Sequence, residues 1–585
     1  MESGQSLLKK TIESLHKEGI GRTTQKVKNF ILNKKKNIIT ASYYEPCMDV
    51  LFINGCDSAI APHPPRYRIT HQKEQLIANN ICSNEVYYTA LSLEQVRNYR
   101  VFIFFRCPIT PLIEEFICIA KQLHKAVLFD IDDLVIDTKY TDQIPYVQSL
   151  SQDEKKIYDE GVIRMGKTLS LCDAAITSTE RLAEELSRYV PEVFINRNTA
   201  SELMIKYSED VLKKSKHPEN ENIMLSKNRK YIKKESEHKK ERNARVRIGY
   251  FSGSITHNAD FELILPAIAK ILRKNSDVSL HIVGELELPK ELKSYQSQII
   301  KEEFIDWTKL PALIESVDIN LAPLEETIFN EAKSENKWVE AALVKVPTIA
   351  SNVGAFKKMI RHGETGLLCE TVEEWYEALN LLIHSEAKRS YLGGNAYKYC
   401  KKNCATIYTG FQLAKFIKSK MTPNIAFVLP SLEISGGIMV ALKHASFLYE
   451  CGLDTFLISE TPGNGWVDYE GYRFPVISRN HHPMYIHIDK AVATMWTTLQ
   501  LLELYPHIRS RFYLVQNFEI DFYKPDIFLR VQASQSYSPS HPIKFITISH
   551  WCKEWLWDLY EQKAAYAPNG IESKRFRPQE RDFSG

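Results

Sequence analysis

The alternation of hydrophobic and polar positions starts three times along the chain. In the first block, short apolar runs such as 48–54 and 126–130 alternate with stretches of helical periodicity such as 113–124. The same alternation begins again at Val246 and a third time at Asn424. Apolar strands that alternate with amphipathic helices are typical of parallel sheets covered by helices on both faces. The pattern therefore predicts an α/β protein with three doubly wound domains.

Two charged segments interrupt this pattern. Apolar positions at helical spacing in the first 36 residues predict a basic amphipathic helix, and residues 206–245 contain few large apolar side chains. The predicted organisation is a helical segment, a first domain, a charged linker or insertion, a second domain with returning helices, and a third domain. Their boundaries are 1–45, 46–205, 206–245, 246–421 and 422–585.

Length and charge refine this organisation. At roughly 150 residues per domain, 585 residues predict about four domains. The net charge is +3, but residues 1–36 and residues 206–245 each carry +6, so the remainder carries 3 − 6 − 6 = −9. This balance excludes a dedicated nucleic-acid binder. The eleven cysteines contain no CxxC pair, which favours a reducing cytosol over a zinc site or a disulfide framework. No apolar run of signal-peptide or membrane-spanning type occurs, so we expect a soluble or peripheral protein.

The first stretch with candidate chemistry is the turn that follows the strand at Val246–Phe251. Backbone N–H groups and hydroxyls at such a turn, where a helix begins, suit a phosphate. An ordinary tight turn is the alternative, because every doubly wound domain contains strand-to-helix turns. The candidate phosphate-binding residues are Gly253, Ser254, Thr256 and His257.

The second stretch is a helix predicted over 333–344. Lys333, Lys337 and Glu340 would share one side of it, where ammonium groups suit phosphates and a carboxylate suits ribose hydroxyls. Ser334 and the preceding Asn330 complete this candidate donor set. A solvated lattice of Glu and Lys side chains remains the alternative.

The third stretch is a group of acids at the end of the predicted strand 126–130. Asp130, Asp132 and Asp133 lie where open α/β sheets place their ligands, and they could hold sugar hydroxyls, act as a base or bind a metal. A helix cap with solvated acids is the alternative. Three arginines also occupy loop positions near strand ends and are candidate acceptor-binding residues or ordinary surface residues: Arg66, Arg68 and Arg106.

Together these stretches resemble glycosyltransferase family 4, whose GT-B fold has two facing Rossmann-like domains. The resemblance covers residues of about 46–421. In the first domain it rests on FDIDDLVID, LCDAAITSTERLAEEL and NRN. In the second domain it rests on IGYFSGSITHNADF, DINLAPL, FNEAKSENKWVEAALVKVPTIAS and HGETGLL.

The resemblance implies that the second domain binds a nucleotide-diphosphate sugar and the first binds the acceptor. Glu340 would contact the ribose as the second acid of the family's Glu-x7-Glu element, whereas Ala332 stands where the first acid belongs. The basic pair of the family's phosphate loop is also missing, so we expect Lys333 and Lys337 to neutralise the diphosphate. The three aspartates would serve acceptor binding or proton handling. The resemblance further implies a retaining reaction without a metal or another cofactor.

The third unit resembles the first half of another GT-B enzyme. The stretch NIAFVLPSLEISGG resembles the start of an acceptor domain, and YLVQNFEIDFY and ISHWCKEWL resemble rhamnosyltransferase-like relatives. The final PNGIESKRFRP resembles the crossing to a second GT-B domain, so we expect a truncated second module. A half-module retained for acceptor binding is the alternative.

The leading functional prediction is a hexosyl- or rhamnosyltransferase that acts on a bacterial surface polysaccharide or a lipid-linked glycan precursor. Its partners would be the nucleotide sugar, the acceptor glycan and no nucleic acid. The enzyme would be cytoplasmic, and the basic N-terminal helix would contact anionic lipids at the inner face of the plasma membrane, or simply pack as a solvated helix. The main alternative is a catalytically degenerate module that binds or scaffolds glycan. A sugar-phosphate epimerase of the same fold is a further alternative.

Overall fold

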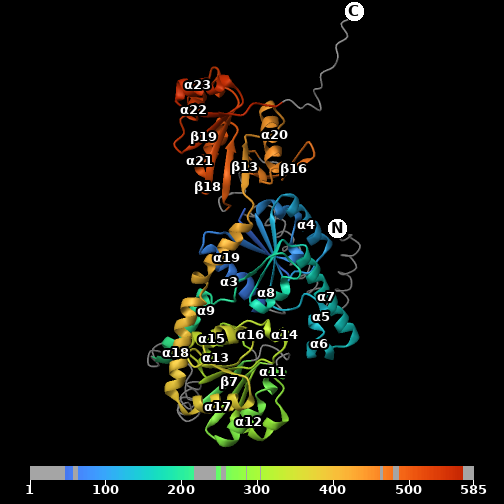
Figure 1. The fold of residues 1–585 in the computed structure, drawn as a ribbon. Coiled ribbons are helices and arrows are strands. Elements are labelled where there is room, and N and C mark those ends of the chain that lie inside the picture. The colour runs from blue at the N-terminus through green and yellow to red at the C-terminus, as the bar shows by residue number, and fades with distance from the viewer. Residues whose placement is uncertain are drawn as a thin grey trace, which may run out of the picture. The chain divides into compact units, whose positions relative to one another are not determined.

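The computed structural model describes residues 47–56, 63–216, 246–251, 258–284, 286–303, 305–461, 465–478 and 486–570. These residues form two compact units. One unit comprises Val50–Leu93 and Arg100–Thr422, and the other comprises Pro423 onward together with short segments that include Glu94–Tyr99. The first unit contains two sheets, here called the first and second lobes, and the other unit contains the third sheet (Figure 1).

The first lobe is a parallel sheet of six strands in the order β2-β1-β3-β4-β5-β6. Its interior strands are wholly buried, as their predominantly apolar sequences predict. The strands are β1 (Val50–Asn54), β2 (Ser83–Tyr87), β3 (Val101–Phe105), β4 (Ala126–Ile131), β5 (Ala174–Thr177) and β6 (Val193–Ile195). The helical segments are α2 (His63–Pro65), η1 (Arg66–Thr70), α3 (His71–Ile77), η2 (Tyr88–Ala90), η3 (Leu93–Asn98), α4 (Pro111–Gln122), α5 (Thr138–Thr141), α6 (Pro145–Ser149), α7 (Gln152–Ser170), α8 (Glu180–Leu186) and α9 (Glu202–Lys216).

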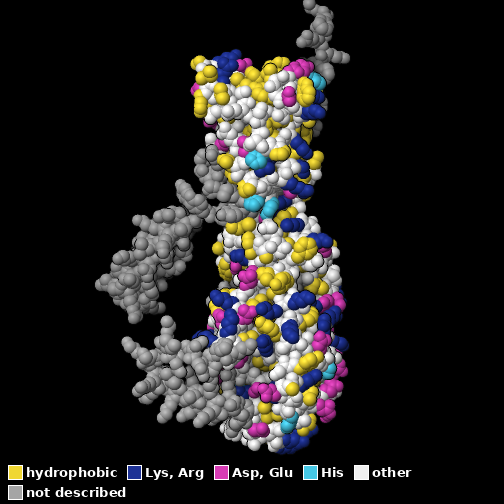
Figure 2. Space-filling view, turned by 90° about the vertical axis from the view of Figure 1, so that its left-hand side faces the viewer, with side chains coloured by type: hydrophobic (Ala, Val, Ile, Leu, Met, Phe, Trp, Pro, Cys, Tyr) yellow, Lys and Arg dark blue, Asp and Glu magenta, His cyan; other side chains and the backbone are white. Residues whose placement is uncertain are grey.

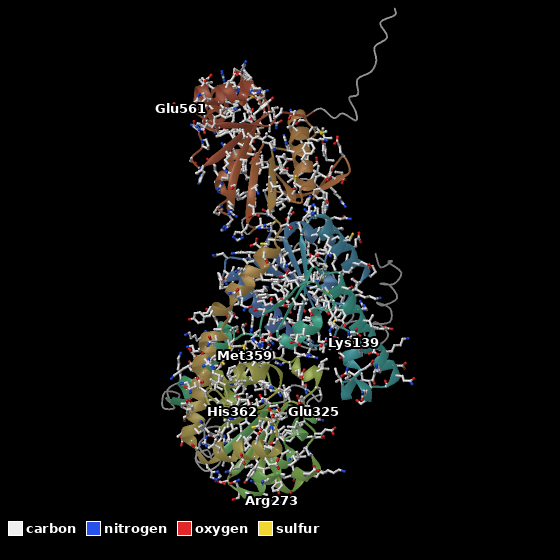
Figure 3. All side chains as sticks on the ribbon, viewed as in Figure 1. Lys139, Arg273, Glu325, Met359, His362 and Glu561 are labelled. Atoms are coloured by element: carbon white, nitrogen blue, oxygen red, sulfur yellow. The ribbon has the colours of Figure 1, made fainter. Side chains whose placement is uncertain are left out.

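The second lobe is a parallel sheet in the order β12-β11-β10-β7-β8-β9, with its switch point between β7 and β10. The strands are β7 (Val246–Phe251), β8 (Val278–Val283), β9 (Ile299–Glu302), β10 (Ile319–Ala322), β11 (Thr348–Ser351) and β12 (Leu367–Cys369). The helical segments are α11 (Asn258–Glu262), α12 (Leu265–Lys274), η6 (Lys290–Gln298), α13 (Leu310–Glu315), α14 (Ile328–Glu331), α15 (Asn336–Leu343), α16 (Gly354–Met359), α17 (Val372–His384), α18 (Glu386–Asn403) and α19 (Thr406–Lys420). Met359 on α16 and Arg273 on α12 lie at opposite ends of this lobe (Figure 3).

The chain crosses between the two lobes twice, and the two crossings are hydrogen-bonded to each other. The Ala200 N–H donates to the carbonyl of Cys404 at 2.7 Å, and the Thr406 N–H donates to the carbonyl of Ala200 at 3.0 Å. After the second crossing, α19 packs on α3 of the first lobe (Figure 1). Phe416 on α19 stacks on Phe194 at 4.5 Å between ring centroids. The final helix of the second lobe's sequence therefore completes the core of the first.

The third sheet follows the order β15-β16-β14-β13-β17-β18-β19-β20 and is parallel except for the antiparallel pair β15–β16. The strands are β13 (Asn424–Leu429), β14 (Asp454–Ser459), β15 (Trp466–Tyr469), β16 (Tyr472–Ser478), β17 (Ile488–Ala493), β18 (Ile508–Val515), β19 (Ile543–Thr547) and β20 (Ala564–Tyr566). The helical segments are α20 (Gly436–Glu450), α21 (Trp496–Leu504), η8 (Glu519–Tyr523), α22 (Ile527–Gln535) and α23 (His550–Tyr560). Figure 2 shows hydrophobic side chains on the surface of this domain.

The structure confirms the predicted fold class, with three doubly wound α/β sheets of which two face each other. It differs from the sequence prediction at the start of the charged segment. Residues 206–216 belong to helix α9, which contacts α13 and α15, and Tyr207 packs edge-on against Trp307 with 5.7 Å between ring centroids. Residues 1–45 and 217–245 lie outside the described residues, and the predicted domain boundaries stay predictions.

Helix α18 approaches the end of α15 closely enough for the two backbones to be in contact. A Cβ atom on Gly393 in α18 would meet the carbonyl oxygen of Lys345, just beyond α15, at 1.9 Å. The neighbouring Gly394 has open space around the same position. Glycine at position 393 therefore lets α18 pack directly against the end of α15.

These two glycines provide a matched test of this packing. We expect Gly393→Ala to lower the free energy of unfolding by about 1–3 kcal/mol, because the new methyl group must push two backbones apart. Gly394→Ala should raise it by about 0.5–1 kcal/mol, since alanine favours a helix and meets nothing here. Denaturant unfolding of both variants is the measurement. Equal effects of the two substitutions would contradict the close approach.

Candidate functional site

A cavity of about 340 Å³ lies between the two facing lobes. Phe251, Val283 and Leu324 line it, and they mark the carboxyl ends of β7, β8 and β10. This is the switch point of the second sheet, where open α/β folds place ligands. Eight of the residues predicted from sequence also line it: Arg66, Arg106, Asp132, Asp133, Lys333, Ser334, Lys337 and Glu340.

The lysines and the glutamate reach the cavity from a loop and a helix. Helix α15 begins at Asn336, so Lys333 and Ser334 belong to the preceding loop and not to a helix over 333–344 as predicted. The loop is fixed by Ala332, which is buried and whose carbonyl accepts a hydrogen bond from Thr179 Oγ1 at 2.8 Å. Lys333, Lys337 and Glu340 still line one cavity, although they do not lie on one face of a single helix.

Lys337 is the least satisfied charge in this cavity. Its Nζ is shielded from solvent and finds no hydrogen-bond partner among the described residues. It lies 5.0 Å from the ring centroid of Tyr250, which attracts a cation only weakly. Burial lowers the pKa of Lys337 to about 8, although Asp260 and Glu340 oppose this shift. A buried ammonium without a hydrogen-bond acceptor is energetically unfavourable. The site therefore suits a ligand that supplies such an acceptor.

Lys333 adds a second cation next to Lys337. Burial lowers the pKa of Lys333, whereas the carboxylates of Asp260 and Asp133 raise it. Its Nζ lies 5.1 Å from the ring centroid of Phe329. Two neighbouring ammonium groups in a shielded cavity match a ligand with more than one negative charge, such as a diphosphate.

Glu340 is held by side chains of the first lobe. The Tyr67 hydroxyl donates a hydrogen bond of 2.6 Å to Glu340 Oε1, and Arg66 Nη2 lies 3.5 Å from the same oxygen. The Arg66 guanidinium lies 4.6 Å from the ring centroids of both Tyr67 and Trp307. Sequence reasoning missed Tyr67 and Trp307. Tyr67 stands between the two predicted arginines of HPPRYR, which is the one signal that could have indicated it.

Asp132 and Asp133 share one arginine at the other side of the cavity. Arg106 Nε donates to Asp132 Oδ1 at 2.7 Å, and Arg106 Nη2 donates to Asp133 Oδ2 at 2.8 Å. These carboxylates raise the pKa of Arg106 further above its ordinary value, against the effect of burial. Arg106 also has a positive φ of 43°, so its backbone turns sharply after β3. Arg106, predicted to bind the acceptor, lines the cavity, but its guanidinium is already bound to these two acids.

Arg68 and Asp130 lie beneath the cavity and do not line it. Both side chains are completely buried, and Arg68 Nε and Nη2 donate to the Asp130 carboxylate at 2.8 and 3.0 Å. Gln72 Nε2 donates a further bond to Asp130 at 2.6 Å. The predicted acceptor contact of Arg68 and proton-handling role of Asp130 are therefore corrected, because neither side chain is accessible to a ligand in the cavity.

This buried pair connects to the cavity through one asparagine. Arg68 Nη1 donates to Asn198 Oδ1 at 3.1 Å, and Asn198 Nδ2 donates to Ser334 Oγ at 3.0 Å. Ser334 belongs to the second lobe, so the chain of hydrogen bonds joins the two lobes. Asp130 and Arg68 thus position the loop that carries Lys333 and Ser334.

The remaining predicted residues divide into two groups. Asn330 is buried and donates hydrogen bonds to Asp260 Oδ1 at 2.8 Å and to the carbonyl of Glu325 at 3.1 Å, so it supports the loop after β10 and does not line the cavity. Glu331, beside Ala332, lies 3.3 Å from Arg181 Nε and does not line the cavity either. The candidate phosphate-loop residues lie outside the described residues: Gly253, Ser254, Thr256 and His257.

Comparisons with known proteins give one family match and several similar solved structures. Residues 246–385 match the model of the family described as Glycosyl transferases group 1. None of the curated proteins matches this chain. The solved structure of HepE from Anabaena with UDP and glucose is 13% identical, covers 64% of this chain and 100% of that one, and has a TM-score of 0.40. Sucrose-phosphate synthase from Thermosynechococcus elongatus is 13% identical, with coverages of 64% and 98% and a TM-score of 0.39.

A shorter solved structure is also similar to part of this chain. The C-terminal domain of the group 1 glycosyl transferase LpcC from Francisella tularensis is 23% identical, covers 27% of this chain and 85% of that one, and has a TM-score of 0.22. Within the described parts of the chain, every helix falls short of the length and apolarity that a membrane crossing requires. The family match and the two facing sheets together support a glycosyltransferase with a GT-B fold.

The buried ion pair generates a prediction about stability. We expect Asp130→Asn to lower the free energy of unfolding by about 3–5 kcal/mol, because it leaves the Arg68 charge buried without its counter-ion. Asp133→Asn should cost about 1 kcal/mol or less, since the Asp133 side chain is 31% exposed and Asp132 remains with Arg106. Urea unfolding measures both. A stable Asp130→Asn variant with impaired turnover would instead restore Asp130 as a catalytic residue.

Proposed function

We propose that the two-lobed unit transfers a sugar from a nucleotide-diphosphate sugar to a hydroxyl group of an acceptor glycan. The observation that carries this proposal is the shielded Lys337 ammonium, which lacks a hydrogen-bond partner among the described residues and lies beside Lys333. It belongs to the stretch that matches group 1 glycosyl transferases. A departing diphosphate supplies the acceptor that this ammonium requires.

The proposed chemistry follows from where the charges lie. The bond between the anomeric carbon and the diphosphate oxygen breaks, and Lys333 and Lys337 stabilise the negative charge that develops on the diphosphate. The acceptor hydroxyl oxygen bonds to the anomeric carbon on the same face, and its proton passes to the departing phosphate. The configuration is therefore retained, as the resemblance to family 4 implies. Neither a protein nucleophile nor a metal ion is needed in this proposal.

The two ends of the donor would contact different residues. Glu340, already hydrogen-bonded to Tyr67 through Oε1, offers its second oxygen to the ribose hydroxyls. Asp132 and Asp133, paired with Arg106 in the first lobe, face the acceptor side. We propose a glycan or lipid-linked precursor as the acceptor and a hexose or rhamnose as the sugar. Both choices rest on the resemblance of the sequence.

Release of nucleoside diphosphate from a panel of uridine, thymidine and guanosine diphosphate sugars tests the proposed activity. We expect Lys337→Ala to reduce turnover by roughly 10²- to 10³-fold, as when one transition-state contact is lost. Glu340→Ala should weaken donor binding. Lys357→Ala, on the exposed face of α16, is the matched control and should leave turnover unchanged. Binding of nucleotide without turnover would favour the catalytically degenerate, glycan-binding alternative, which Ala332 at the position of the family's first acid also favours. Unchanged activity of Glu340→Ala would refute the assignment of Glu340 to the ribose.

The lowered pKa of Lys337 predicts how nucleotide binding depends on pH. Lys337 is protonated below about pH 8, so uridine diphosphate should bind with constant affinity there. Above pH 8 binding must add a proton to Lys337, and affinity should fall by up to about tenfold per pH unit. Lys333, whose pKa is also lowered, acts in the same direction. Titration calorimetry between about pH 7 and pH 10, a range that includes the titration of these lysines, measures the affinity.

Lys337→Arg is the matched variant for the pH experiment. Arginine keeps its charge throughout this range, so the fall in affinity should become shallower. An affinity that falls equally with pH in the wild type and in Lys337→Arg would contradict the role of Lys337.

A site of action at the inner face of the plasma membrane is also part of the proposal. It rests on the basic sequence of residues 1–36, which lie outside the described residues. The chain with and without these residues should differ in its sedimentation with anionic vesicles, and this difference should shrink at high salt. Equal sedimentation of the two forms would remove the membrane from the proposal.

A further inference from the structure

Helix α19 has apolar side chains on two opposite faces. Its inner face buries Leu413, Phe416 and Ile417 in the core of the first lobe. Its outer face carries Tyr408 and Phe411, which are 66% and 63% exposed to solvent. A surface helix normally has one apolar stripe, which faces the core, and a polar face opposite to it. Packing of α19 against the sheet therefore leaves the two outer aromatic residues unexplained.

The exposed aromatic residues have apolar neighbours. Ile407, in the same turn of α19, is 43% exposed, and Ile77 is 58% exposed at the end of α3, the helix on which α19 packs. The two helices approach closely because residue 410 is a glycine: a Cβ atom on Gly410 would lie 2.6 Å from the carbonyl oxygen of Gln75. The exposed apolar side chains thus belong to two helices in contact, whereas exposed apolar residues on an ordinary surface are scattered singly.

Two lysines continue the outer face of α19. Lys415 and Lys418 follow Tyr408 and Phe411 by seven residues each, which is about two helical turns, and both lysines are exposed. Neither lysine forms an ion pair within the described part of the chain, although Lys418 Nζ donates to the carbonyl of Asn79 at 3.4 Å. The outer face therefore has aromatic rings in its first half and positive charges in its second half.

The positive charge extends to the preceding helix. Residues 386–420, which span α18 and α19, contain eight lysines and arginines and one acidic residue, a net charge of +7. Glutamates elsewhere in the chain offset two of these charges, at Lys401 and Lys420. Figure 2 views the side on which α19 lies in Figure 1 and shows hydrophobic and basic side chains interspersed on it. Exposed aromatic rings beside excess positive charge complement a surface with anionic groups outside and an apolar interior.

We propose that the outer face of α19 is a contact surface for an anionic lipid bilayer. Tyr408 and Phe411 enter the headgroup region, where amphipathic aromatic rings are favoured. Lys415 and Lys418 lie against the anionic headgroups. The helix lies in the plane of the interface, and its inner face stays in the core of the first lobe. The inference goes beyond the proposed function, because it uses neither the cavity between the lobes nor residues 1–36.

Sedimentation of the full chain with lipid vesicles tests this surface. One set of vesicles is phosphatidylcholine alone, and the other is phosphatidylcholine mixed with an equal amount of phosphatidylglycerol. The wild type should sediment with the anionic vesicles and much less with the neutral ones. Tyr408→Ser combined with Phe411→Ser should weaken binding to the anionic vesicles roughly tenfold or more, because two rings no longer leave water. The binding that remains should still fall with added salt.

Lys415→Gln combined with Lys418→Gln should also weaken binding to the anionic vesicles roughly tenfold, because each lysine near an anionic surface contributes to the attraction. The binding that remains should depend less on salt than that of the wild type, since two of the screened charges are gone. The two double variants thus separate the apolar part of the contact from its electrostatic part.

Matched controls are available on other exposed helices of the two-lobed unit. Ile157→Ser, on α7, removes an apolar side chain that is 72% exposed. Arg273→Gln combined with Lys293→Gln removes two exposed charges, on α12 and η6. Both controls should sediment as the wild type does. All of the substituted side chains are exposed, so thermal unfolding of every variant should match that of the wild type.

Three results would overturn the inference. One is that the wild type sediments with neither kind of vesicle, which would leave the outer face of α19 to a protein partner. Another is equal sedimentation with neutral and anionic vesicles. The third is that both double variants of α19 sediment as the wild type does, which would place the bilayer contact elsewhere in the chain.

The inference and the proposed function fail separately. Absence of sugar transfer, with sedimentation that still depends on α19, would remove the proposed reaction and leave the lipid contact intact. Sedimentation that is lost on removal of residues 1–36 but is unaffected by the α19 variants would assign the membrane contact to the N-terminal segment and overturn the inference.

Discussion

The buried charge of Lys337 is the constraint on which the architecture of the two-lobed unit depends. An ammonium group shielded from water and without a hydrogen-bond acceptor among the described residues is tolerated only when many other contacts stabilise its surroundings. Those contacts are visible around it: α18 presses on the end of α15 through Gly393, and the loop before α15 is tied to the first lobe through Ala332 and Ser334. These contacts offset the unfavourable burial of the Lys337 ammonium and hold it in position for an anionic ligand.

The two lobes contribute different kinds of charge to the cleft. On the second-lobe wall, Lys337 Nζ finds no hydrogen-bond partner among the described residues, whereas in the first lobe Arg106 is paired with both Asp132 and Asp133. Excess positive charge therefore gathers on one wall of the cavity and balanced charge on the other. This asymmetry gives a ligand with a diphosphate at one end a defined orientation between the lobes.

The sequence predicts much of this fold but less of the site. Uninterrupted apolar runs such as 101–105 identify buried parallel strands, because both faces of such strands are covered. The sequence predicts that Lys337 and Glu340 lie together, because residues three positions apart in a helix lie on the same face. Local spacing could not show that α15 starts at Asn336, or that Arg68 reaches Asp130 from a distant segment. Pairing of this kind depends on tertiary structure, as does the contact of Tyr67 with Glu340.

The paired crossings at Ala200 and Cys404 have a mechanical consequence. Since the two connections between the lobes are hydrogen-bonded to each other, they behave as one narrow joint and not as two separate tethers. A relative movement of the lobes then has to be absorbed by backbone torsions at this joint, while α19 stays attached to α3. Such a joint favours rotation over sliding, so the walls of the cleft can separate and meet again in the same register.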